Sequence, residues 1–314
     1  MNRPLAIASK PPTTSALRTA LRWSAIDGLL LLVAAVWGGS YTAAKVATQQ
    51  LPVLEFLVLR FGLTFILLLP TLRHVAGPKW RSALGGAALL GINLLVIFIC
   101  ETFGVSLTTA SNAAFLISLC IAVTPICEWW LLGRRPTRMT LLAAGLSLTG
   151  ASLLAFQHGG DTQLAWGDAL MVGAAILRGI MVCMTRRYAL SHTIPALSLT
   201  AIQMGVMTAG AGIVLVVAQG WHFHPIPTTV EFWAATAFLV LLCTLFAFFV
   251  QNYAASRASP SRVALLMGSE PLFGALIAGL WLGESMTALG WFGGSLMLVA
   301  AWRVTRTPAD ERAP

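Results

Sequence analysis

Apolar stretches of about twenty residues recur along the whole chain, separated by short segments rich in arginine, proline or polar residues. A helix that rises about 1.5 Å per residue needs roughly 20 apolar residues to cross a hydrocarbon core about 30 Å thick. Apolar residues occupy every side of these stretches, whereas the strands of a membrane barrel alternate apolar with polar residues. The pattern predicts ten membrane-spanning helices, at residues 27–47, 54–72, 83–104, 109–131, 139–156, 166–185, 196–218, 231–254, 262–282 and 287–304.

The composition agrees with an integral membrane protein. Hydrophobic residues make up 57% of the chain and charged residues 10%, and the mean hydropathy is +0.81. Soluble domains carry about 25% charged residues, so this chain has too few ionic groups to cover a water-facing surface. We therefore expect the lipid bilayer to surround most of it.

The net charge of +9 does not indicate nucleic-acid binding, because the basic residues are dispersed. They lie in the N-terminal 26 residues, in alternate loops and after the last span, while the remaining loops carry no Lys or Arg. This asymmetry places the basic segments, and with them both termini, in the cytosol. Residues 1–26 contain no apolar run, so we expect a cytosolic arm there rather than a signal peptide.

The two halves of the chain resemble each other. Laid without gaps on residues 261–301, residues 111–151 match at several positions, and Leu132–Gly133 falls on Leu282–Gly283. Five spans in each half would invert the second half relative to the first, an architecture in which transporters bind cargo near mid-membrane. The predicted organisation is a cytosolic arm, a five-helix repeat, an inverted five-helix repeat and a cytosolic tail, at residues 1–26, 27–156, 166–306 and 307–314.

The residues that usually carry catalysis or bind metals are not arranged for either role. All five histidines fall in predicted loops, and the five cysteines lie inside apolar stretches without a CxxC pair. No GxSxG, HExxH or DxxxD motif occurs, and the acidic residues are scattered rather than clustered for a metal ion. We predict no catalytic residues, no cofactor and no metal site, and an intramembrane enzyme is the disfavoured alternative.

Three segments of the chain are distinctive: WGGSYTAAK in the first span, TTASNAAFLISLCIAVTP in the fourth and SRVALLMGSEPLFGALIAGLWLGE in the ninth. In this order they resemble the drug/metabolite transporter superfamily, specifically its ten-helix EamA-type branch. Within that branch the chain looks most like the YddG-type amino-acid exporters. The resemblance extends from Asp27 to about Arg306. It implies a helix bundle around a central cavity and alternating-access export of amino acids or related metabolites across a bacterial inner membrane.

Two positions depart from that family. Its members often have Glu after the Leu-Gly that ends each repeated hairpin, but here only Glu284 is present and Arg134 stands at the matching position. They also often have an aromatic residue in the sixth span where this chain has Arg178. We interpret the first departure as a matter of topology and the second as a matter of substrate.

Charges inside the predicted spans need a reason, because a charge near the centre of a membrane helix costs about 2.5–3.5 kcal/mol on insertion scales. Arg178 and Glu270 each lie about eight residues from the cytosolic end of a span, which places both roughly 12 Å deep. We predict that they meet, directly or through a substrate. They either bracket an amino-acid zwitterion, which suits the forked guanidinium, or form a structural ion pair.

Lys45, Arg60 and Glu101 fall toward the outer ends of the first three spans. There they could gate the cavity or act as an electrostatic funnel. The simpler alternatives are that Lys45 snorkels to the membrane interface and that Arg60 forms a stabilising pair with Glu101. If protons drive transport, Glu101 and Glu270 are the acids expected to couple them.

Proline and acidic residues elsewhere in the spans have both functional and simple explanations. Pro125 in the fourth span and Pro271 in the ninth can kink their helices and free a carbonyl as a ligand, although such prolines are also ordinary bends. Glu128 is expected to pair at the surface with the arginines that follow it. Asp27 and Asp168 are expected to cap helices.

A small-molecule site usually combines aromatic walls with a few polar groups. Trp37 and Tyr41 lie four residues apart and so share one face of the first helix. Amides of the third, fourth and eighth spans could bond a substrate, although amides also join helices to one another. These amides are Asn93, Asn112, Gln251 and Asn252. Tyr253 lies near a helix end and is expected to be an interfacial anchor.

The sequence therefore favours a carrier of small zwitterions. A channel would show a filter-like loop or rings of like charge. Phosphorylated sugars or nucleotide sugars would need several cations facing one cavity, and cationic drugs are a further alternative cargo. Small residues such as Gly274 and Ala278 leave both a monomer and a weak homodimer open.

Overall fold

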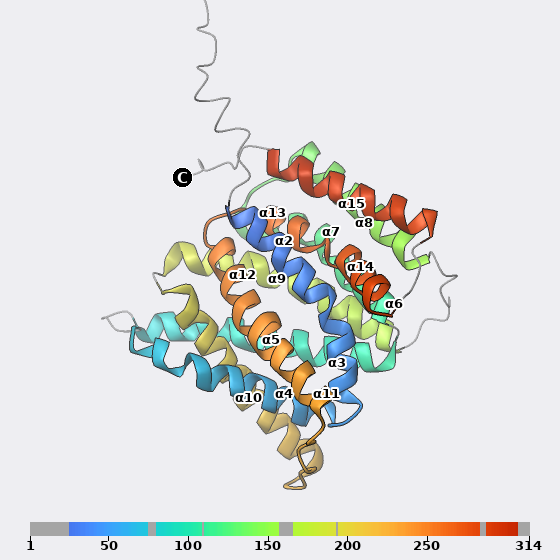
Figure 1. Ribbon diagram of the computed structural model, residues 1–314. Helices are drawn as coiled ribbons and strands as arrows, with labels where there is room; N and C mark the ends of the chain where they lie inside the picture. The colour runs from blue at the N-terminus through green and yellow to red at the C-terminus, as the bar shows by residue number, and fades with distance from the viewer. Residues whose placement is uncertain are drawn as a thin grey trace, which may run out of the picture.

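A computed structural model of the chain describes residues 25–74, 80–108, 110–156, 166–192, 194–282 and 287–306. Over these ranges the secondary structure is helical and contains no strand. Figure 1 shows the helices packed side by side and across one another in one bundle. The prediction of an all-α membrane fold is confirmed at this level.

The helices follow the predicted spans closely. In residues 25–156 they are α2 (Ala25–Gly38), α3 (Ser40–Thr48), α4 (Val53–Leu68), the 3-10 helix η1 (Leu69–His74), α5 (Trp80–Leu107), α6 (Ala110–Ser118), α7 (Cys120–Leu132) and α8 (Arg138–Ala155). In residues 166–306 they are α9 (Trp166–Ser191), α10 (Ala196–Gln219), α11 (Val230–Phe238), the π-helix η3 (Leu239–Phe246), α12 (Ala247–Ala255), α13 (Pro260–Met267), α14 (Glu270–Leu282) and α15 (Ala288–Arg306).

Within the described residues, 8 helical segments are long and apolar enough to cross a membrane. They correspond to the first eight predicted spans, from Ala25–Thr48 to Val230–Ala255. The ninth and tenth predicted spans correspond to α13 with α14 and to α15, which are not among those 8. Length and composition thus mark a multi-pass membrane protein, while ten crossings stay a prediction.

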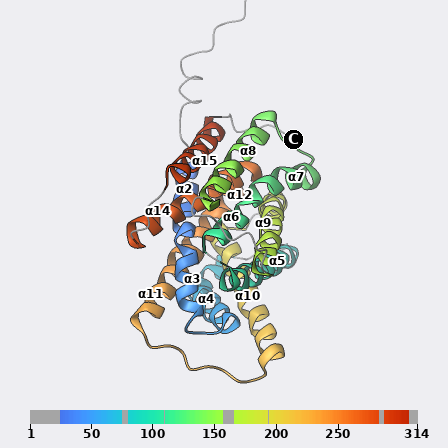
Figure 2. The same ribbon diagram turned by 90° about the vertical axis from the view of Figure 1, so that its right-hand side faces the viewer.

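The helices form successive layers. α8 and α15 lie together at one end of the molecule, and α4 and α10 lie together at the opposite end, in both Figure 1 and Figure 2. Between these layers α2 packs against α12, α13 and α14, while α9 packs against α5, α6 and α7. The middle of the bundle therefore contains α2, with α3 that continues it, and α9. The helices that pack against these three surround them.

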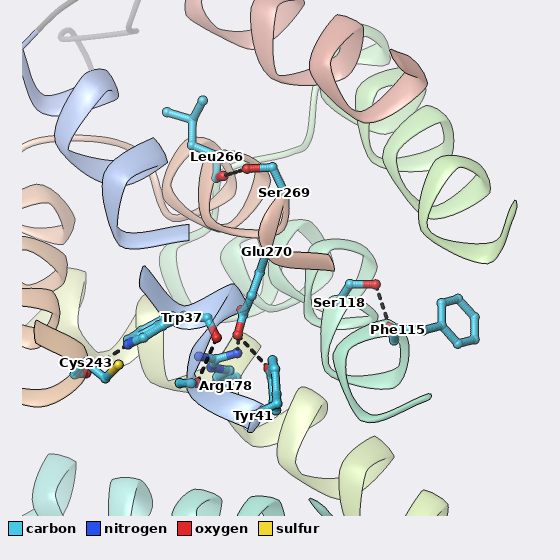
Figure 3. A network of polar contacts seen from close by, with 10 residues as sticks. Trp37, Tyr41, Phe115, Ser118, Arg178, Cys243, Leu266, Ser269 and Glu270 are labelled. Carbon is cyan, nitrogen blue, oxygen red and sulfur yellow. Dashed lines mark hydrogen bonds and ion pairs between the residues drawn. The ribbon is translucent and has the colours of Figure 1, made fainter. Parts of the chain in front are cut away.

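Three of the predicted spans are interrupted near their middles, at Gly39, at Leu119 and at Gly268–Ser269. At each interruption a serine hydroxyl donates to the carbonyl three residues earlier, at 2.6–2.7 Å; Figure 3 shows two of these bonds. Such bonds satisfy carbonyls that a broken helix would otherwise leave without a partner in a membrane. The serines are Ser40, Ser118 and Ser269.

The bounds of the helices repeat between the two halves. α6, α7 and α8 begin at Ala110, Cys120 and Arg138, and α13, α14 and α15 begin at Pro260, Glu270 and Ala288. These starts match under the same shift that aligns residues 111–151 with residues 261–301. The breaks at Leu119 and Ser269 match under it as well, so the last three helices of each half begin at equivalent positions.

Close packing of α8 on α15 depends on two glycines. A Cβ added at Gly150 would lie 2.4 Å from the carbonyl oxygen of Gly293, so the two backbones touch there. Gly145 lies on the same helix, and a Cβ there would meet nothing within 4 Å. The nearest atom at Gly150 belongs to the backbone, so it cannot move aside as the flexible Met297 side chain beside it can.

Gly150→Ala should therefore destabilise the protein by about 1–3 kcal/mol, as overpacking of a tight core typically does. Gly145→Ala is the matched control and should change stability by less than about 0.5 kcal/mol. Fluorescence-detected thermal unfolding in detergent compares the two variants. Equal melting temperatures for the two variants would mean that the backbones of α8 and α15 do not touch at Gly150 and Gly293.

Candidate functional site

Four side chains form a polar cluster at the middle of the bundle, and we call Trp37, Tyr41, Arg178 and Glu270 the central cluster. The Arg178 Nη1 donates to the Glu270 Oε2 over 3.1 Å, and the Tyr41 hydroxyl donates to the Glu270 Oε1 over 2.5 Å. Glu270 is only 3% exposed, so both bonds compensate a carboxylate removed from water. Figure 3 shows Arg178 and Tyr41 converging on this carboxylate.

The break between α13 and α14 explains the position of Glu270, because Glu270 is the first residue of α14. Its carboxylate lies near the positive end of that helix, where the free backbone N–H groups favour an anion. Pro271 follows at the second helical position, where its missing N–H removes no helical bond. The proline therefore begins a helix here instead of kinking one. Pro125, by contrast, lies inside α7.

Trp37 forms a wall behind the arginine. The guanidinium carbon of Arg178 lies 4.3 Å from the centroid of the Trp37 indole, a cation–π distance. The indole N–H donates to the Cys243 carbonyl over 2.8 Å. This bond and the contact with Arg178 together hold the ring in place. Cys243 lies in the π-helix η3, and π-helical segments occur often at functional sites.

Two cavities meet at the central cluster, and both are lined by Trp37 and Arg178. The Arg60 cavity contains about 380 Å³ of empty space, part of it continuous with solvent, and adds Tyr41, Arg60, Phe98 and Glu101 to its walls. The Gln251 cavity contains about 340 Å³, and its walls include Cys120, Gln251 and Glu270. Together Trp37 and Arg178 separate the two spaces.

The cavities lie on opposite sides of the central cluster along the spans. Tyr41 and Glu101 belong to the second halves of the first and third spans, whereas Gln251 lies near the end of α12. With the N-terminus in the cytosol, as the sequence predicts, the Arg60 cavity is the outer one and the Gln251 cavity the inner one.

The structure brings together five of the seven residues predicted for the substrate cavity. Each of these five lines one of the two cavities: Trp37, Tyr41, Arg178, Gln251 and Glu270. The Gln251 Oε1 is buried, and no residue in the described part of the chain bonds it. Asn93 is not among the lining residues and donates to the Leu177 carbonyl over 3.4 Å, which joins α5 to α9. The side chain of Asn112 lies outside the described part of the structure.

The residues predicted for gating or ion coupling separate into two groups. Arg60 and Glu101 line the Arg60 cavity, while Lys45, Pro125 and Pro271 line neither cavity. The predicted ion pair between Arg60 and Glu101 is wrong. The Arg60 Nε instead donates to the Thr244 hydroxyl over 2.9 Å, because Arg60 faces η3.

Three acidic residues have partners that the sequence did not indicate. Glu128 was expected to pair at the surface with nearby arginines, but it is buried and accepts bonds from the amide and hydroxyl of Ser261. Asp27 was expected to cap a helix, and it forms an ion pair with Arg262. Asp168 accepts a bond of 2.7 Å from Thr108, the residue that follows α5. Each of these bonds joins segments that are far apart in the sequence.

Sequence reasoning did not single out Ser118, Cys120 or Gly268, which line the Gln251 cavity at the broken helices. The serines beside the breaks were the available signal, because a hydroxyl that bonds the preceding turn is common where a membrane helix is interrupted. Phe98 and Thr102 were missed in the Arg60 cavity for lack of any such signal.

The sequence matches the EamA-like transporter family twice, over residues 25–156 and 165–306. An uncharacterized transporter of Archaeoglobus fulgidus is 26% identical over 286 residues, covering 88% of this chain and 96% of that protein. The uncharacterized inner membrane transporter YicL of Salmonella typhimurium is 28% identical over 288 residues, covering 86% and 91%. A probable terminal-alkyne amino-acid exporter of Streptantibioticus cattleyicolor is 22% identical over 302 residues, covering 90% and 94%.

A protein of known crystal structure has the same fold. It superposes with a TM-score of 0.72 at 15% sequence identity, covering 89% of this chain and 95% of the other. At that identity the likeness concerns the fold alone.

Proposed function

The chain belongs to the EamA-like transporter family, and on that premise we propose that it exports amino acids or related small zwitterionic metabolites across the bacterial inner membrane. The family and the similar proteins are transporters rather than enzymes, so cargo and mechanism are what need a proposal. The YddG-type specificity stays a prediction.

One observation carries the proposed mechanism: two cavities lie on either side of the Trp37–Arg178 contact. A carrier with alternating access needs a barrier between two spaces that face opposite sides of the membrane. In this conformation the central cluster is that barrier. Opening it requires Arg178 to leave either Glu270 or Trp37, so movement of cargo is tied to a rearrangement of the central cluster.

The repeated helix bounds support an architecture of two five-helix repeats, at residues 27–156 and 166–306, with the second one inverted. In such transporters the cargo site lies where interrupted helices meet near mid-membrane. Here the interruptions at Gly39, Leu119 and Gly268–Ser269 adjoin the two cavities, which Trp37, Cys120 and Gly268 line. The architecture and the proposed site therefore agree.

The charge balance favours zwitterionic cargo. Arg178 is already neutralised by Glu270, so the central cluster presents no excess positive charge to a phosphate. The amino-acid exporter of Streptantibioticus cattleyicolor supports the same class of cargo, at 22% identity. Phosphorylated sugars and cationic drugs are the alternatives that an experiment has to separate.

The test is uptake into proteoliposomes. Labelled amino acids, sugars, sugar phosphates and cationic drugs are compared with protein-free liposomes and with competition by unlabelled compound. We expect saturable uptake of amino acids that unlabelled amino acid suppresses. Uptake restricted to phosphorylated or cationic compounds would leave the transporter in place and overturn the proposed cargo.

A further inference from the structure

The Arg60 cavity is lined by two charged residues, Arg60 and Glu101, that form no ion pair with any described residue. Arg60 is 5% exposed, and among the described residues no carboxylate lies within the 4.0 Å of an ion pair. Glu101 lines the same cavity, and its Oε2 is buried and has no hydrogen-bond partner among the described residues. A buried charge without a partner is costly, so such a charge usually marks a place where another group supplies the partner.

Arg60 is held in an orientation that leaves most of its donors free. Its Nε bonds the Thr244 hydroxyl, and its guanidinium carbon lies 5.1 Å from the Phe98 ring centroid and 5.5 Å from that of Phe61. A guanidinium has five N–H donors, and the pair at its outer end matches a carboxylate in a bidentate bond. No recorded bond among the described residues uses that pair.

Glu101 stands one helical turn beyond Phe98 on α5, so both face the same cavity. Its carboxylate and the Arg60 guanidinium line the same space but lie too far apart for an ion pair. Within the described part of the chain, one cation and one anion that form no ion pair therefore face a common volume. The third charged residue at this cavity, Arg178, is neutralised by Glu270, which lines the Gln251 cavity.

We propose that the Arg60 cavity is a binding subsite for α-amino acids, in which Arg60 binds the carboxylate and Glu101 binds the ammonium group. Trp37, Tyr41 and Phe98 form the aromatic wall for the side chain. This inference rests on the proposed function and deepens it. It separates cargo binding from the Arg178–Glu270 pair, whose two charges are already satisfied. The subsite favours zwitterions over anions because its charges sum to zero.

The test uses ligands that lack one charge at a time. L-leucine is compared with 4-methylpentanoate and 3-methylbutylamine, and L-phenylalanine with 3-phenylpropanoate and 2-phenylethylamine. Each is measured as an inhibitor of amino-acid uptake in proteoliposomes and as a ligand that raises the unfolding temperature in detergent. Wild type should prefer at least one of the two amino acids over both of its analogues by about tenfold to a hundredfold, which is typical of a hydrogen bond to a charged group.

Two variants should lose opposite halves of that preference. Glu101→Gln should bind the amino acid no better than its acid analogue but keep its preference over the amine. Arg60→Gln should show the reverse pattern. Arg187→Gln is the matched control, because Arg187 lies exposed on α9 and does not line the cavity. It should behave as wild type.

The outcomes separate this inference from the proposed function. If amino acids are transported but the two variants lose affinity for all three ligands equally, or for none, the subsite is wrong and the function stands. If wild type binds neither amino acid better than its analogues, the subsite is overturned as well. If wild type moves only phosphorylated or cationic compounds, both the cargo and the subsite fall. Where Arg60→Gln does not fold, Arg60→Lys replaces it, because an ammonium keeps the charge and loses the bidentate bond.

Discussion

Arg178→Ala is expected to reduce transport to the level of protein-free liposomes, the largest functional effect of any single change in this protein. The variant removes the guanidinium that bonds Glu270 and lies over Trp37. The barrier between the two cavities then loses its central side chain, and Glu270 is left buried with only Tyr41 as a partner. Uptake assays with vesicles matched for protein content measure the effect.

A loss of transport has to be separated from a loss of folding. Breaking a buried ion pair typically costs about 3–5 kcal/mol, so the unfolding temperature of Arg178→Ala should fall as well. Arg187→Ala is the matched control, because Arg187 lies exposed on the same helix. It should leave both transport and unfolding near wild type.

The charge swap Arg178→Glu with Glu270→Arg decides between the two roles of the pair. It can restore the attraction between α9 and α14. It also reverses the sign of the charged side chains that line the two cavities at these positions. We expect stability to recover in part while transport stays low. A swapped protein that transports the same compounds as wild type would show that the pair only holds the helices together.

Arg262→Gln is expected to produce the largest loss of stability, about 3–5 kcal/mol, through the ion pair that joins α13 to α2. The Arg262 Nε and Nη2 bind the two carboxylate oxygens of Asp27 at 2.9 and 2.7 Å. Asp27 is 1% exposed, so the variant removes a bidentate bond to a buried carboxylate. Fluorescence-detected unfolding in detergent measures the change.

Three companion variants define the origin of that loss. Arg262→Lys should recover only part of the stability, because an ammonium cannot form the bidentate bond. Asp27→Asn combined with Arg262→Gln should be less destabilising than the sum of the single changes, because neither charge is then left alone. Arg257→Gln, at an exposed arginine near the same end of the bundle, should change stability by less than about 0.5 kcal/mol. Additive effects in the double variant would contradict the pairing.

The contact between Arg178 and Glu270 could be predicted because depth in the membrane follows from counting residues. A helix rises by a constant amount per residue, and both residues lie the same distance from the cytosolic end of a span. Counting cannot say which way a side chain points around its helix. Arg60 and Glu101 illustrate this: an ion pair between them was the simpler of two alternatives, yet Arg60 bonds Thr244 and both residues line a cavity without pairing.

The helix breaks, too, could be predicted from the sequence only in part. The prolines at residues 125 and 271 drew attention to the right spans, but the breaks fall at Leu119 and at Gly268–Ser269. A break forms where neighbouring groups replace the lost backbone bonds, and here serine hydroxyls supply them. Which residues supply such bonds depends on the packed neighbours as well as on the local sequence.

The sequence alone determined the number of apolar stretches, the all-helical membrane class, the likeness of the two halves and the family, because each of these depends on hydropathy and on local pattern. Tertiary structure alone decided that Asp27 pairs with Arg262 and that Arg60 pairs with no carboxylate among the described residues. The reason is physical. Lipid demands an apolar surface wherever a helix meets it, whereas the partner of a buried charge depends on how each helix is rotated and placed against its neighbours.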